Sequence, residues 1–252
     1  MKFLLPLIPL ALFLASCATS PVYTDKHGHM HIDTSSSRQS PSMIATGEKI
    51  FNEYKKNKKV VYNSQVARVG NRLKKVAPLP GVNWEIVTFQ NSVPNAFALP
   101  GGKVGIHTGI LPLAKTDGGL ATIIAHEIAH VTKNHHEQRQ KRQAVVGGLG
   151  ALANAALGGG YGQLIGTTSQ LAVNLPNSRT NEIEADQVGL IYMARAGYNP
   201  NEAIAFWQRF EQYKKSKGQQ SSPLFSTHPH DSTRIARLKQ VLPLAMKEYK
   251  PR

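Results

Sequence analysis

The stretch GLATIIAHEIAHV, residues 119–131, decides the fold of this chain. Its apolar residues Leu120, Ile124, Ile128 and Val131 recur at helical spacing, which predicts a helix with one buried stripe. The same helix carries the pattern H-E-x-x-H. A helix that is apolar and still contains two histidines and a glutamate needs a reason for burying them.

The two histidines of this pattern can share one metal ion. His126 and His130 are four residues apart, so their rings lie about 40° apart around the helix axis and reach one point in space. Neutral imidazole is a good zinc ligand. Glu127 then lies beside the metal without binding it, where it can take a proton from water and return it to a leaving amine. The alternative is a polar helix face that happens to carry two histidines.

A catalytic zinc also needs a third protein ligand and an open position. The candidates lie in the acidic segment NEIEAD, residues 181–186, within a predicted helix. Glu182 and Glu184 point about 200° apart, so only one of them can face the metal. Glu182 and Asp186 share a face, which suits one as a ligand and the other as hydrogen-bond acceptor for a ligand histidine. The alternative is a solvated acidic face.

A third segment, STHPHD at residues 226–231, brings two more histidines. His228 or His230 can approach such a metal. Either side chain would then stabilise an oxyanion or occupy the open position and hold the site inactive.

Together these segments resemble the HtpX-like zinc metallopeptidases, which include the CAAX prenyl proteases, and are most similar to the small bacterial lipoprotein and periplasmic members. The resemblance rests on residues 126–130, 181–186 and 227–229, on Arg234, and on the upstream segment 95–102. In contrast to other members, the sequence shows no set of membrane spans and no C-terminal helical-repeat domain, so substrate delivery by those parts is not carried over.

The resemblance implies the roles of the metal-site residues. His126, His130 and Glu182 would bind one Zn²⁺ per chain. Glu127 would be the catalytic base, and Asp186 would support a ligand histidine from behind.

The resemblance also implies a fold and a substrate-binding edge. His228 would lie near the metal as an electrostatic helper or a gate, with Arg234 close by. The fold would be α+β: a mainly helical, gluzincin-type metalloprotease domain with a small antiparallel sheet beside the HExxH helix. The strand at Asn95–Leu99 would be the edge on which a substrate peptide pairs.

Apolar spacing predicts further elements along the chain. We expect helices at 43–56, 62–77, 178–196, 200–217 and 231–248, and strands at 84–89, 96–99 and 103–107. Residues 145–162 are rich in glycine, and three interpretations stay open: a loop, a close-packed helix pair or a membrane contact.

The N-terminus predicts export. Residues 1–16 read as a signal peptide, and Cys17, the single cysteine of the chain, ends a lipobox-like Leu-Ala-Ser-Cys run. We therefore expect lipid on Cys17, a flexible linker up to residue 42 and a folded domain at 43–252. Ala18 in place of aspartate indicates the outer membrane, facing the periplasm.

The composition limits the function classes. Hydrophobic residues make up 41% of the chain, which excludes wholesale disorder. The net charge of +15 predicts attraction to anionic surfaces, while export argues against nucleic acid as a partner. We expect a zinc endopeptidase acting on unfolded or misfolded envelope proteins, in an oligomeric state that the sequence does not indicate. The rivals are a latent or chaperone-like binding protein and a basic protein of membrane surfaces.

Overall fold

The computed structural model describes residues 21–144, 178–217, 228 and 233–251. Its main helices are α1 (Pro41–Asn57), α2 (Ser64–Lys74), α3 (Leu111–Ala114), α4 (Asp117–Thr132), α7 (Arg179–Arg195), α8 (Asn201–Lys217) and α10 (Arg234–Glu248). Its strands are β1 (Val22–Thr24), β2 (Met30–Ile32), β3 (Val60–Val61), β4 (Glu85–Phe89), β5 (Ala96–Leu99) and β6 (Lys103–His107). The predicted signal peptide and the glycine-rich stretch 145–162 lie outside the described residues.

The predicted fold class is confirmed, with one difference in the sheet. The four strands run in the order β3-β4-β6-β5. The β3–β4 and β5–β6 pairs are antiparallel, but β4 and β6 are parallel, so the sheet is mixed. After β4 the chain forms β5 at the outer edge of the sheet. It then reverses direction at Gly101 and Gly102, which both take positive φ, and β6 pairs between β4 and β5.

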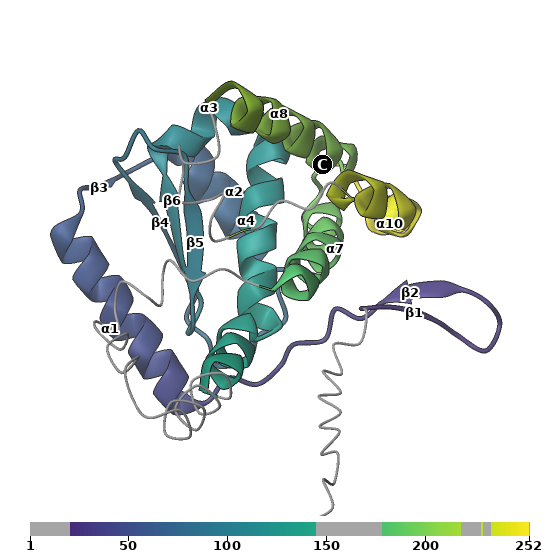
Figure 1. The fold of residues 1–252 in the computed structure, drawn as a ribbon, viewed down its shortest axis with the longest axis horizontal. Helices are drawn as coiled ribbons and strands as arrows, with labels where there is room; N and C mark the ends of the chain where they lie inside the picture. Colours follow the sequence, from purple (N-terminus) through teal and green to yellow (C-terminus); the bar gives the residue numbers. More distant parts are fainter. Residues whose placement is uncertain (1–20, 145–177, 218–227, 229–232, 252) are drawn as a thin grey trace, which may run out of the picture.

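Helix α4 stands between the sheet and the helices α7, α8 and α10 (Figure 1). Thr116 caps its first turn by accepting a hydrogen bond from the Gly119 N–H. The sequence predicted one buried stripe, whereas every residue from Gly118 to Thr132 is buried. The reason is that the sheet packs on one side of α4 and helices pack on the other. The polar residues of this helix are therefore held in the core.

Helices α4 and α7 approach each other closely at Gly189. A Cβ atom at this position would lie 3.0 Å from the backbone nitrogen of His126 and 3.1 Å from the carbonyl carbon of Ala125. A side chain would have to displace the backbone of α4. The glycine thus sets the distance between the two helices that carry the candidate metal ligands.

The segment between β2 and α1 is packed against the domain, although its composition indicated a flexible linker. The Ser37 N–H donates to the carbonyl of Thr132 at 2.7 Å, and Gln39 Nε2 donates to the carbonyl of Val131 at 2.8 Å. These carbonyls belong to the last turn of α4, where the Val131 carbonyl also accepts from the Asn134 N–H. The segment therefore holds the chain before α1 against the C-terminal end of α4. No helix within the described ranges is long and apolar enough to cross a membrane.

Candidate metal centre

Four buried side chains from α4, α7 and residue 228 meet at one point: His126, His130, Glu182 and His228. The Nε2 atoms of His126 and His130 are 3.0 Å apart. Glu182 places Oε2 at 3.3 Å from the first ring and Oε1 at 3.2 Å from the second. His228 Nδ1 lies 3.2 Å from His126 Nε2 and 3.1 Å from the Glu182 carboxylate.

These spacings fit a tetrahedral zinc ion. Zinc bonds of about 2.0–2.1 Å hold the ligand atoms of a tetrahedron about 3.3 Å apart, close to the distances between these four groups. The donor set of three imidazoles and one carboxylate is also one that zinc prefers. The predicted ligands His126, His130 and Glu182 are thus brought together, and His228 adds a fourth donor at the same point.

The charges around the cluster favour a divalent cation. Three buried carboxylates, on Glu127, Glu182 and Asp186, lie around the cluster. Arg234 is the guanidinium that meets two of them: its Nη2 donates to Glu182 at 2.8 Å and its Nε donates to Asp186. A bound Zn²⁺ would offset further negative charge of these carboxylates.

Asp186 contacts His126 on the side of the ring away from the cluster. Its Oδ1 lies 2.9 Å from His126 Nδ1, the nitrogen that faces away from the cluster. The Arg234 guanidinium also stacks on the Trp207 ring, 3.8 Å from its centroid, and so is fixed from both sides. The i, i+4 spacing of Glu182 and Asp186 on α7 thus places one carboxylate at the cluster and the other behind a ligand ring.

Glu127 has a free acceptor beside the cluster. Its Oε1 is buried and takes no hydrogen bond from any described residue, although His228 Nε2 lies 3.3 Å away. Burial raises the pKa of Glu127 above its ordinary value, against the opposing charges of His228 and His126. A carboxylate of raised pKa with an unused oxygen is suited to receive a proton.

The other groups of the cluster are shifted by burial and by one another. Burial would raise the pKa of Glu182, but the charges of His228, His130 and His126 outweigh it and hold that pKa well below its ordinary value. Burial lowers the pKa of His130 well below its usual range. At His126 burial acts in the same direction, but hydrogen bonds to Asp186 and Glu182 outweigh it and raise the pKa to about 10.

Two residues near the cluster were missed by the sequence reasoning. His135 contacts His130, and Glu184 contacts His135. Glu184 was set aside because it cannot face the same point as Glu182, and His135 follows the helix that carries the motif. No helical or strand spacing in the sequence connects His135 to His130 or to Glu184. The other loop candidate, His230, lies outside the described residues.

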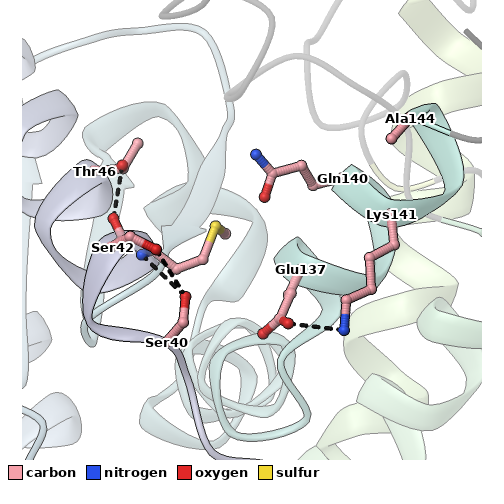
Figure 2. A pocket seen from close by; sticks show the side chains of 8 residues that line it. Ser40, Ser42, Thr46, Glu137, Gln140, Lys141 and Ala144 are labelled. Carbon is pink, nitrogen blue, oxygen red and sulfur yellow. Dashed lines mark hydrogen bonds and ion pairs between the residues drawn. The ribbon is translucent and has the colours of Figure 1, made fainter.

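A separate open pocket of about 440 Å³ lies between the start of α1 and the helical residues 135–144 (Figure 2). Ser40, Ser42 and Thr46 line one side, and the paired side chains of Glu137 and Lys141 line the other. It contains none of the metal-cluster residues, and its charged groups neutralise each other. The chemistry of the chain therefore centres on the cluster.

Comparison with known proteins agrees with this site. The sequence profile of peptidase family M48 matches residues 61–242. The mitochondrial metalloendopeptidase OMA1 of Schizosaccharomyces pombe is 37% identical over 71% of this chain and 53% of its own length. OMA1 of Saccharomyces cerevisiae is 36% identical over 68% of the chain and 50% of its own length.

A bacterial relative is similar to a lower degree. A putative beta-barrel assembly-enhancing protease of Vibrio cholerae is 30% identical over 74% of the chain and 41% of its own length. The chain spans about half the length of the first two relatives. M48 metalloproteases are zinc-dependent, in agreement with the donor set of the cluster. By the match over residues 61–242, the chain belongs to peptidase family M48.

Proposed function

We propose that the protein is a zinc-dependent metalloendopeptidase. The observation that carries the proposal is the buried Oε1 of Glu127, which takes no hydrogen bond from the described residues, beside a cluster of metal-ligand side chains. A structural zinc site needs ligands but no base. The names of the relatives support the same activity, since they are called metalloendopeptidases.

Each residue of the site has a role in this proposal. His126, His130 and Glu182 would hold the zinc, which would supply a Lewis acid for the scissile carbonyl and acidify water. Glu127 takes the proton from water and delivers it to the leaving amine. Asp186 keeps the proton of His126 on Nδ1 and its Nε2 directed to the metal.

The edge strand β5 is proposed to bind the substrate backbone. The Asn95 carbonyl accepts from the His107 N–H. In an antiparallel pair, alternate residues direct their backbone N–H and C=O groups to the partner strand. Ala96 and Ala98 therefore direct their backbone groups away from β6. The Nε2 atom of His136 lies 2.8 Å from the Ala98 carbonyl oxygen and pairs with it. Ala96 directs a donor and an acceptor to the side away from β6, but it is fully buried, so an extended peptide would pair there only after this edge is uncovered.

The substrates and place of action are proposed from the sequence. We infer that the chain is exported, carries lipid on Cys17 at the outer membrane facing the periplasm, and degrades misfolded envelope proteins. A bacterial relative is named a beta-barrel assembly-enhancing protease, which supports the setting, whereas the OMA1 relatives are mitochondrial. Palmitate labelling of the chain in bacteria tests the anchor: Cys17→Ser should abolish the label, and labelled Cys17→Ser protein would refute it.

The activity is tested with the full chain purified in detergent, loaded with zinc and mixed with unfolded casein. Wild type should cleave it, and Glu127→Gln should bind about one zinc per chain but not cleave. Glu137→Gln is the matched control, since this acid pairs with Lys141 in the separate pocket. Equal cleavage by Glu127→Gln and wild type would refute the proposed base.

A second candidate is a latent or chaperone-like protein, and one observation favours it. His228 Nδ1 lies where a fourth zinc ligand would lie, so four protein groups can close the site. In a latent protein, His228→Ala releases cleavage of casein. If His228 instead stabilises the oxyanion, the same variant loses cleavage.

A further inference from the structure

The second nitrogen of each ligand histidine has a different partner. His126 Nδ1 meets the carboxylate of Asp186 directly. His130 Nδ1 instead lies 2.8 Å from Nδ1 of another buried histidine, His135. His135 Nε2 lies 3.1 Å from Glu184 Oε2. The two ligand rings are thus supported by different means, and only the second uses an intermediate ring.

One arrangement of protons satisfies all of these contacts. If His130 Nε2 binds zinc, the single proton of that neutral ring is on Nδ1 and is donated to His135 Nδ1. His135 then carries its own proton on Nε2 and donates it to Glu184. The opposite order would put the proton of His130 on the nitrogen that faces the metal and prevent its coordination.

The backbone turns His135 toward His130. Helix α4 ends at Thr132, and Asn134 takes a positive φ of 54°, a left-handed conformation that asparagine tolerates better than most residues. The next helical stretch begins at His135. Because the chain changes direction here, a residue five positions after His130 faces its ring.

Glu184 has a second partner, Lys133, at the far end. Lys133, whose side chain is 6% exposed, places Nζ 3.7 Å from Glu184 Oε1 and 3.3 Å from Asp33 Oδ2. Glu184 lies two residues from Glu182 on α7 and points to another side of that helix, so it cannot support the cluster directly. The ring of His135 spans the gap.

We propose that His135 and Glu184 are positioning residues that hold His130 in the tautomer and orientation required for zinc binding. The proposal rests on the proposed zinc site. Removal of such outer partners typically weakens metal affinity by about 10–100-fold. The neighbouring His136 provides a natural contrast, since it is also buried but bonds the carbonyl of Ala98.

The test measures zinc binding by the full chain, in competition with a chromophoric chelator. His135→Phe should weaken zinc binding about 10–100-fold. His135→Gln, whose side-chain oxygen can accept from His130, should recover most of the affinity, and Glu184→Gln should lose less than His135→Phe. His136→Phe is the matched control: it should lower the thermal midpoint but leave the zinc affinity within about threefold of wild type, because it does not touch a ligand.

Cobalt substitution separates positioning from general stability. The visible bands of Co²⁺ report ligand geometry, so His135→Phe should shift them while His136→Phe leaves them unchanged. Equal zinc affinity in His135→Phe and wild type, or equal losses in His135→Phe and His136→Phe, would overturn the proposal. If His135→Phe does not fold, Glu184→Gln decides: unchanged affinity and cobalt bands would overturn it. If the wild type binds zinc and cleaves casein while these variants are unaffected, the positioning role is overturned and the proposed function stands. If the wild type binds no zinc, the positioning role and the proposed function are both overturned.

Discussion

Replacing Arg234 by methionine should destabilise the metal-free chain strongly. The guanidinium is 3% exposed and bonds two carboxylates, on Glu182 and Asp186, that are 3% and 6% exposed. Removing one partner of a buried ion pair leaves an uncompensated charge and costs about 3–5 kcal/mol. For a domain of this size each kcal/mol lowers the midpoint by about 2–4 °C, so the expected drop is about 6–20 °C.

The assay is thermal unfolding followed by circular dichroism in the presence of a chelator. Adding Asp186→Asn to Arg234→Met should restore part of the loss, because it removes a charge that the first change left unpaired. Lys215→Met, which breaks an exposed pair with Glu211 on α8, is the control and should change the midpoint little. A drop below about 4 °C for Arg234→Met, or no recovery in the double variant, would refute the reasoning.

Three further outcomes follow from the structure. Gly189→Val should cost about 1–3 kcal/mol and weaken zinc binding, because a Cβ there meets the backbone of His126 at 3.0 Å; unchanged thermal unfolding and zinc titration would contradict this. Burial, reinforced by the charge of Arg139, lowers the pKa of His136 to about 3. The unfolded chain therefore binds an extra proton below about pH 6.5, and stability falls between pH 6.5 and 3 by about 1.4 kcal/mol per unit. His136→Gln should reduce that slope in urea titrations at several pH values. Chelation should lower the thermal midpoint, since zinc binds the folded state; a midpoint insensitive to chelator would argue against metal binding.

Local pattern predicted the long helices well. The expected helices 178–196 and 200–217 correspond to α7 and α8 within one residue at each end. The predicted helix 62–77 corresponds to α2, which begins later, at Ser64, and ends earlier, at Lys74. The elements that were missed are short, such as β3 and α3, and depend on tertiary contacts more than on their own periodicity. The parallel pairing of β4 and β6 also lies beyond local pattern, since it depends on where β5 is placed.

The same distinction applies to the site. The i, i+4 pairs on α4 and α7 predict which residues share a face, and the structure brings their side chains together. The contact of His130 with His135 depends on a left-handed turn at Asn134, and the contact of His135 with Glu184 joins residues 49 positions apart. Neither contact has a periodic signal in the sequence. The packing of residues 33–40 on α4 escaped prediction for the same reason.

The position of Arg234 on α10 has a consequence for how the chain matures. His126, His130 and Glu182 all leave a ribosome or a translocon before Arg234 does, so a growing chain carries the ligands without the cation that two of its acids require. Arg234 reaches Glu182 and Asp186 when α10 packs against α7 and α8. For the proposed peptidase, this order would delay cleavage of unfolded polypeptides until its own chain has folded and is no longer a substrate.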